Sequence, residues 1–143
     1  MLLRDILKQK GADVHRVTPS ASLAEAVDRL VEHNIGSLLV CDGESIAGII
    51  TERDILRACR THAGQLESQV VRDHMTGLDQ LVTGKPDDRI SEVMGLLTEK
   101  RIRHLPVLED GKLVGLISIG DVVKAQHDLL SVENHYLKSY IQG

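Results

Sequence analysis

The 143-residue sequence has no phenylalanine and no tryptophan, and its two tyrosines, Tyr136 and Tyr140, lie near the C-terminus. Many proteins that bind single-stranded nucleic acid stack the bases on aromatic side chains, and this chain has almost none to offer. Lysine and arginine are outnumbered by aspartate and glutamate, 17 to 21, and form no long basic run. We therefore expect neither nucleic acid nor an anionic membrane surface as a partner.

Long apolar runs and cysteines are also scarce. No stretch approaches the roughly 18 apolar residues that a membrane-spanning helix needs, and the first residues do not resemble a secretory signal. Cys41 and Cys59 are too few for a disulfide framework and lack metal-ligand spacing. The seven histidines are scattered, so we expect no metal site. These features predict a cytoplasmic protein with two reduced thiols.

The sequence does contain an internal repeat and enough apolar residues, 42%, for an aliphatic core. When residue 19 is placed over residue 86, a constant shift of 67 matches positions through both halves without a gap. The identical pairs include Pro19 and Pro86, Glu25 and Glu92, Leu30 and Leu97, Ile35 and Ile102, Gly48 and Gly115, and Asp54 and Asp121.

Each repeat has the same predicted elements. An extended piece (14–17, then 81–83) precedes a helix, which in the first repeat begins with a Ser22–Glu25 capping box and presents Leu23, Val27, Leu30 and Val31 at helical spacing. Two strands follow (37–40 and 46–50, then 104–108 and 113–117), and the Asp-Gly turn between them is typical of a hairpin. A second helix begins near Thr51 or Ser118.

The predicted fold class is therefore α/β (α+β), with two tandem βαββα repeats related by pseudo-twofold symmetry and with their sheets packed together. We expect the first repeat at 1–65, the second at 66–128, and a C-terminal helix extension at 129–143.

The junction between the last strand and the last helix of each repeat carries the same short motif, Thr51-x-x-Asp54 and Ser118-x-x-Asp121. This spacing is that of a capping box, in which the hydroxyl and the acid satisfy the backbone at the helix start. The same carboxylate could instead accept hydrogen bonds from the two neighbouring hydroxyls of a ribose. The spacing alone favours the capping interpretation.

Several segments together resemble the tandem CBS-domain pair (cystathionine-β-synthase-type), also called a Bateman module. They are 48–54, 115–121, 101–107 and 72–76, and the resemblance extends from about Arg4 to Gln126. It implies that Asp54 and Asp121 hold ribose with the help of Thr51 and Ser118. It further implies phosphate contacts from Arg53, Arg103 and His104, and an adenine pocket lined by Met75 and Thr76.

The function that the resemblance implies is a regulatory or signalling module that binds an adenosine-containing nucleotide in the cleft between the repeats. AMP or NAD(H) come first because cations are few, while ADP, ATP and S-adenosylmethionine stay open. No nucleophile–base set and no glycine-rich phosphate loop indicates an enzyme. Such pairs also occur inside inosine-monophosphate dehydrogenases. The catalytic barrel of those enzymes needs about 250 residues, more than these 143 residues can supply.

The alternative is a structural dimerisation module with a vestigial nucleotide cleft. In either case we expect a homodimer, because apolar residues recur at helical spacing near the C-terminus and need a cover. These residues are Val132, Tyr136, Leu137, Tyr140 and Ile141. A downstream protein partner is also expected, and nothing in the sequence identifies it.

Overall fold

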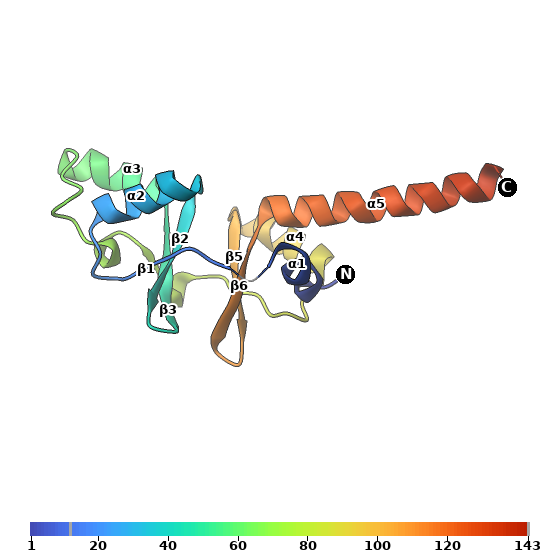
Figure 1. The fold of residues 1–143 in the computed structure, drawn as a ribbon, viewed down its shortest axis with the longest axis horizontal. Coiled ribbons are helices and arrows are strands. Elements are labelled where there is room, and N and C mark those ends of the chain that lie inside the picture. The colour runs from blue at the N-terminus through green and yellow to red at the C-terminus, as the bar shows by residue number, and fades with distance from the viewer. Residues whose placement is uncertain (12, 143) are drawn as a thin grey trace. The chain divides into compact units, whose positions relative to one another are not determined.

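The computed structural model describes residues 1–11 and 13–142, which form a mixed α/β fold of two compact units (Figure 1). One unit is the continuous segment Asp13–Val82, and the other combines Met1–Ala12 with Thr83–Gly143. Each unit contains one repeat hairpin with its helices. The units are therefore described separately below.

In the Asp13–Val82 unit a four-stranded sheet has the order β1-β2-β3-β4. The strands are β1 (Arg16–Val17), β2 (Ser37–Asp42), β3 (Ser45–Thr51) and β4 (Thr76–Gly77). The helices are α2 (Leu23–His33) and α3 (Glu52–His62), and two short 3-10 turns, η1 (Val71–Asp73) and η2 (Leu78–Gln80), flank β4. The predicted hairpin turn is confirmed, with Gly43 at φ +63°, a value that glycine adopts without strain.

The core of this unit is aliphatic, as the composition predicts. Leu23, Ala26 and Leu30 of α2 pack with β-strand residues such as Leu38 and Ile50. Burying one leucine or isoleucine side chain contributes about 1.5–3 kcal/mol, so these residues hold the helix on the sheet.

The capping box predicted for α2 is borne out in part, because the Ser22 hydroxyl accepts a hydrogen bond from the Glu25 N–H at 3.1 Å. The prediction that Val31 shares the buried face of α2 is wrong, since Val31 is 74% exposed. At 3.6 residues per turn it lies about 100° around the helix from the middle of the buried stripe.

The second unit contains α1 (Leu3–Lys10), α4 (Ile90–Lys100), β5 (His104–Glu109), β6 (Lys112–Ser118) and α5 (Ile119–Gln142). Strands β5 and β6 form an antiparallel pair. The predicted extended piece at 81–83 is not a strand here; a single parallel bridge joins Gly84 to Val107. A side chain at Gly84 would begin 2.7 Å from a methyl of Leu105 and 3.0 Å from one of Leu3, so these leucines close over the backbone.

The opening segments of the two repeats exchange places. In one unit the Leu3 N–H donates to the Asp88 carbonyl at 3.0 Å, and in the other the Val71 N–H donates to the Ala21 carbonyl at 2.9 Å. These bonds are equivalent in the repeat alignment, because one inserted residue makes the shift 68 in the opening segments, which pairs Leu3 with Val71, whereas the shift of 67 pairs Ala21 with Asp88. The start of repeat one therefore folds with repeat two, and the start of repeat two with repeat one. The boundaries 1–65 and 66–128 remain a prediction about the sequence repeats, and the compact units cross them.

The two copies differ at their ends. Helix α3 ends at His62, and the next two residues, Ala63 and Gly64, both have positive φ. Helix α5 instead runs for 24 residues, about 36 Å at 1.5 Å per residue. No glycine or proline interrupts α5 after Gly120. Within 1–11 and 13–142, no helix is long and apolar enough to cross a membrane.

Candidate functional site

The Thr51–Asp54 motif lies where β3 ends and α3 begins. Oδ2 of Asp54 accepts hydrogen bonds from the Thr51 N–H at 2.9 Å and from the Thr51 hydroxyl at 3.1 Å. The Asp54 N–H donates back to Thr51 Oγ1 at 3.4 Å. Asp54 is only 8% exposed, and its second oxygen, Oδ1, lies 3.8 Å from Nη1 of Arg57. The motif therefore forms a complete capping box.

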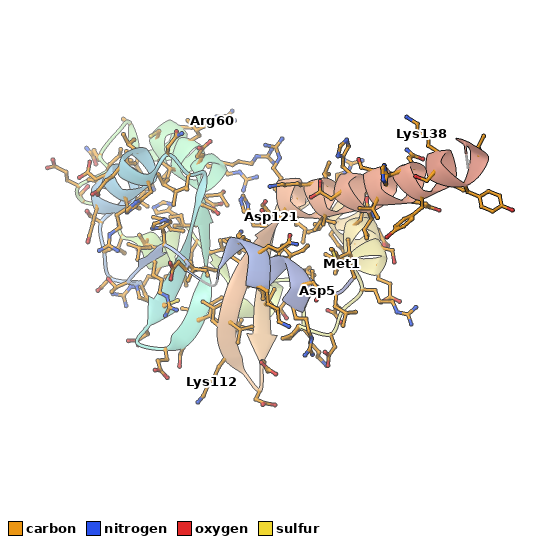
Figure 2. All side chains as sticks on the ribbon, turned by 45° about the vertical axis from the view of Figure 1, so that its right-hand side comes forward. Met1, Asp5, Arg60, Lys112, Asp121 and Lys138 are labelled. Carbon is orange, nitrogen blue, oxygen red and sulfur yellow. The ribbon has the colours of Figure 1, made fainter. Side chains whose placement is uncertain are left out.

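The Ser118–Asp121 motif repeats this geometry between β6 and α5, where Figure 2 labels Asp121. Oδ2 of Asp121 accepts from the Ser118 N–H at 2.8 Å, and the Asp121 N–H donates to Ser118 Oγ at 3.0 Å. Oδ2 also accepts from Nζ of Lys10 at 2.7 Å, and Lys10 donates to the Leu116 carbonyl at 2.9 Å as well. Lys10 comes from α1, in the same compact unit.

Burial and the hydrogen-bond partners of Asp121 act on its pKa in opposite directions. Burial is the largest single influence and raises the pKa, because it disfavours the charged form. The hydrogen bonds from Lys10 and Ser118 and the positive charge of Lys10 together outweigh burial and lower the pKa of Asp121 below its usual value of 3.8. Asp121 is therefore a carboxylate at neutral pH.

The capping interpretation of the motif is confirmed at both junctions, but capping does not exhaust what the carboxylates can accept. An ionised carboxylate has about four lone-pair sites. The hydrogen bonds within each box use Oδ2 alone. Each cap also fixes the direction of its carboxylate at a helix start. The geometry is therefore compatible with a cap that also binds ribose hydroxyls.

Met75 and Thr76 lie beside the strand that leads into the first motif. Thr76 pairs with Ile49 in the β3–β4 ladder. A side chain at Gly48 would begin 2.2 Å from the Thr76 carbonyl oxygen and 3.1 Å from Sδ of Met75, so the backbone approaches closely here. Arg53, at the second position of α3, is exposed. The Asp13–Val82 unit thus contains Thr51, Arg53, Asp54, Met75 and Thr76.

Arg103 and His104 belong to the unit that contains Asp121. His104 lies opposite Ser118 in the β5–β6 ladder, and the Arg103 carbonyl accepts from the Ile119 N–H at 2.8 Å. His104 is half-buried and Arg103 is exposed. The predicted phosphate ligands are therefore divided, because Arg53 belongs to the other unit. That all three converge on one phosphate stays a prediction.

Lys10 is a site residue that sequence reasoning missed. The resemblance between repeats upstream of the helices is short, and a lysine in the last turn of a helix is ordinary because it complements the helix dipole. Only the fold of α1 against β6 and α5 brings it to Asp121. No sequence signal pointed to this contact.

Among the described residues, no group of three or more histidine, cysteine, aspartate or glutamate side chains could hold a metal ion. His15 and His33 stack with ring centroids 3.9 Å apart, and His62 meets His74 edge-on at 5.4 Å. Two imidazoles without a further ligand fall short of a structural zinc site.

Comparison with known proteins agrees with this fold and its motifs. Residues 3–61 and 71–128 both match the CBS domain family. The CBS domain-containing protein CBSX3, mitochondrial, of Arabidopsis thaliana is 36% identical over 148 residues, covering 99% of this chain and 72% of that protein.

Solved structures of similar proteins extend the agreement. The CBS-domain protein ATU1752 from Agrobacterium tumefaciens is 38% identical with a TM-score of 0.82, covering 88% of this chain and 99% of that one. The CBS domain pair of protein MJ0100, solved with 5′-methylthioadenosine and S-adenosyl-L-methionine, is 25% identical with a TM-score of 0.75, covering 90% and 97%. The chain therefore belongs to the CBS-domain family and contains two CBS domains in tandem.

Proposed function

We propose that this CBS-domain pair is a regulatory sensor, not an enzyme, and that it binds an adenosine-containing nucleotide through Asp54 and Asp121. The observation that carries the proposal is the duplicated motif at the two strand–helix junctions. In each copy a carboxylate is fixed at a helix start beside a hydroxyl side chain. A similar domain pair, that of MJ0100, was solved with two ligands that both contain adenosine.

The roles follow from the chemistry of the ligand. A ribose offers two adjacent hydroxyl donors, and one carboxylate can accept both. Thr51 and Ser118 assist with their hydroxyls. Arg53, Arg103 and His104 face the phosphate, and Met75 and Thr76 line the adenine.

AMP and NAD(H) remain the first candidates for the ligand, since the chain as a whole carries a net charge of −4. ADP, ATP and S-adenosylmethionine are the further candidates. The direct experiment denatures the purified protein and identifies released small molecules by mass spectrometry. We expect an adenosine-containing compound. Added at about 100 times its dissociation constant, it should stabilise the fold by roughly 2.7 kcal/mol.

The alternative is a structural dimerisation module whose nucleotide cleft is vestigial. One observation favours it, because the capping boxes account for both motifs without any ligand. This alternative predicts that no adenosine compound is released on denaturation. It also predicts that no adenine nucleotide raises the melting temperature, which the sensor proposal does not allow.

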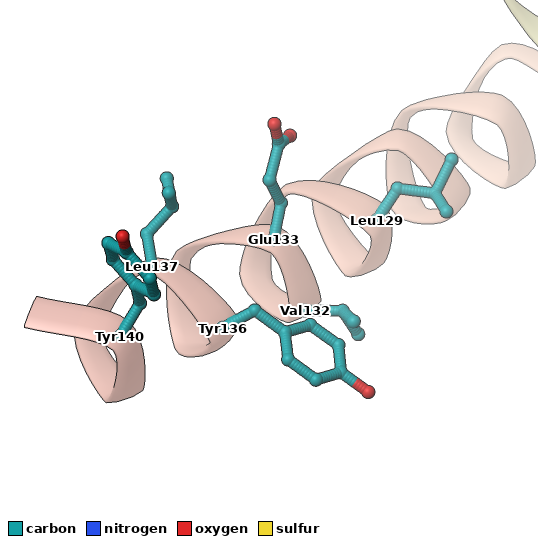
Figure 3. Close-up of a pocket in the computed structure, with 6 residues that line it drawn as sticks. All are labelled: Leu129, Val132, Glu133, Tyr136, Leu137 and Tyr140. Atoms are coloured by element: carbon teal, nitrogen blue, oxygen red, sulfur yellow. The ribbon is translucent and has the colours of Figure 1, made fainter. Parts of the chain in front are cut away.

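We also propose a homodimer formed through the C-terminal half of α5. Leu129, Val132, Tyr136, Leu137 and Tyr140 line one region of this helix with Glu133, and Val132 and Tyr136 project from the same side (Figure 3). Tyr136 is 70% exposed, and an apolar face of this length needs a cover. Light scattering should show a dimer at micromolar concentration, and Val132→Glu combined with Tyr136→Glu should give a folded monomer. A monomeric parent protein would contradict the proposal.

The sensor role further requires a downstream protein that responds when nucleotide binds. We propose that this CBS-domain pair and its downstream partner are cytoplasmic.

A further inference from the structure

The Thr51–Asp54 and Ser118–Asp121 motifs differ in what lies along the edge of the strand that precedes each motif. In the Asp13–Val82 unit, β4 pairs along the outer edge of β3, with Thr76 opposite Ile49. Leu116 is the counterpart of Ile49 in the repeat alignment. In the other unit β6 has no pairing strand on that side among the described residues. The carbonyl of Leu116 accepts instead from the ammonium of Lys10 at 2.9 Å.

The same ammonium lies on the carboxylate of the motif. Nζ of Lys10 is 2.7 Å from Oδ2 of Asp121, the oxygen that also accepts the Ser118 N–H. That oxygen therefore already accepts two hydrogen bonds, and one of the donors is a full positive charge. At Asp54 the second donor is the neutral hydroxyl of Thr51.

The charged neighbours of the two carboxylates also differ. The cation near Asp54 is Arg57, which lies 3.8 Å from Oδ1 with a side chain that is 71% exposed. Asp121 has Lys10 in hydrogen-bond contact, with a side chain that is 34% exposed. With the shift of 68 that places Arg4 on Arg72 in the opening segments, the residue that aligns with Lys10 is Leu78, which carries no charge. Of the two motifs, only the Asp121 motif therefore has a lysine at this position.

We propose that Lys10 makes the Asp121 motif selective for phosphorylated nucleosides over neutral nucleosides. This inference rests on the proposed function and specifies the ligand class of one of its two motifs. A neutral nucleoside that binds Asp121 shares the carboxylate with the ammonium, which already holds Oδ2, and offers that ammonium no negative charge in return. A nucleotide offers its phosphate, and the flexible four-carbon stem of lysine lets the ammonium turn from Asp121 to that phosphate.

The surroundings of the motif support an anionic ligand. Arg103 precedes the strand residue opposite Ser118 and is exposed, and His104 is that strand residue. Their counterparts in the other repeat are Gly36 and Ser37. Cationic and imidazole side chains thus lie on the Asp121 side, where a phosphate would need them.

The test measures affinities for AMP and adenosine by titration calorimetry in an Asp54→Ala background, so that the Asp121 motif is observed alone. In this background AMP should bind more tightly than adenosine. Lys10→Met should reduce the ratio of the two affinities by about tenfold or more, since a charge-assisted hydrogen bond is replaced by none. Lys10→Arg should keep most of the ratio. Lys8→Met is the matched control, because it removes an exposed lysine from the same helix.

Three outcomes would overturn the inference. The first is an unchanged affinity ratio in a folded Lys10→Met protein, or in Lys10→Gln if the methionine variant does not fold. The second is an equal change in Lys8→Met, which would show a general charge effect. The third is an Asp54→Ala protein that binds neither ligand although the parent binds AMP, which leaves the proposed function with Asp54 alone. A parent protein that binds no adenine nucleotide would instead refute the proposed function itself.

Discussion

Replacing the motif aspartates separates their role as helix caps from their role as ligands. Asp54→Ala removes the oxygen that accepts the Thr51 N–H at 2.9 Å and the Thr51 hydroxyl at 3.1 Å. A hydrogen bond to a charged group contributes about 1.5–3 kcal/mol, and a donor left unsatisfied costs about 1–3 kcal/mol. We expect a loss of about 1–3 kcal/mol in the free energy of unfolding, because the Thr51 hydroxyl still caps the Asp54 N–H.

The effect on ligand affinity should be larger than capping can explain. If ribose donates one or two hydrogen bonds to the carboxylate, its loss weakens binding by about 10- to 100-fold or more. Asp54→Asn sharpens the test, because the amide oxygen can still accept the Thr51 N–H while the charge and one acceptor are lost. This variant should keep most of the stability and still bind adenine nucleotides poorly.

Asp5 provides a matched control for losing a helix cap. Its Oδ2 accepts the Leu2 N–H at 2.8 Å at the start of α1, the same relation that Asp54 has to Thr51, but outside the motif. Asp5→Ala should lower the melting temperature without changing nucleotide affinity. Calorimetric titration and thermal melting on the same samples measure both quantities, and about 1 kcal/mol corresponds to roughly 2–4 °C for a chain of this size.

Asp121→Ala should behave similarly with one addition. It also removes the Lys10 ion pair, whose carboxylate is 25% exposed, so solvent screening limits the extra loss of stability to about 1 kcal/mol or less. The reasoning is refuted if both alanine variants bind adenine nucleotides like the parent while their melting temperatures fall. The motif would then be a pair of helix caps and nothing more.

Three further predictions concern the fold, pH and the buried thiol. Gly48→Ala should destabilise the protein by about 1–3 kcal/mol, because its side chain would begin 2.2 Å from a backbone oxygen. Gly115→Ala meets only a movable methyl of Leu7 at 2.4 Å, so equal losses in urea unfolding would contradict this. The lowered pKa of Asp121 stabilises the fold above the usual carboxyl pKa of about 4, and this contribution is lost as pH falls through the folded-state value. The difference in unfolding free energy between the parent and Asp121→Asn should therefore shrink between about pH 7 and about pH 3, and a constant difference would count against it. Burial raises the pKa of Cys41, against a smaller opposing effect of Arg16, so its thiol should react slowly with an alkylating reagent in the native protein, and rapid labelling would contradict this.

Much of the architecture follows from local patterns that the sequence displays openly. The 67-residue shift predicts two copies of one unit, and the Asp-Gly turns predict the hairpins that both copies form. The Thr51–Asp54 spacing predicts a capping box, and the structure contains it. Caps, turns and helical periodicity act over a few residues, so the side chains that make them can be recognised in order along the chain.

Only the tertiary structure decided which segment covers which edge. The predicted boundaries assign α1 to the first repeat, yet its first backbone N–H groups donate to the carbonyls of Pro86 and Asp88 in the second. In the other unit β4 pairs along one edge of β3, whereas no described strand pairs along the equivalent edge of β6. Lys10 and Asp121 are 111 positions apart. Such contacts depend on how whole helices and strands pack. The two repeats carry nearly the same motif, yet β4 lies beside the first copy and Lys10 contacts the second, and no local sequence pattern predicts this difference.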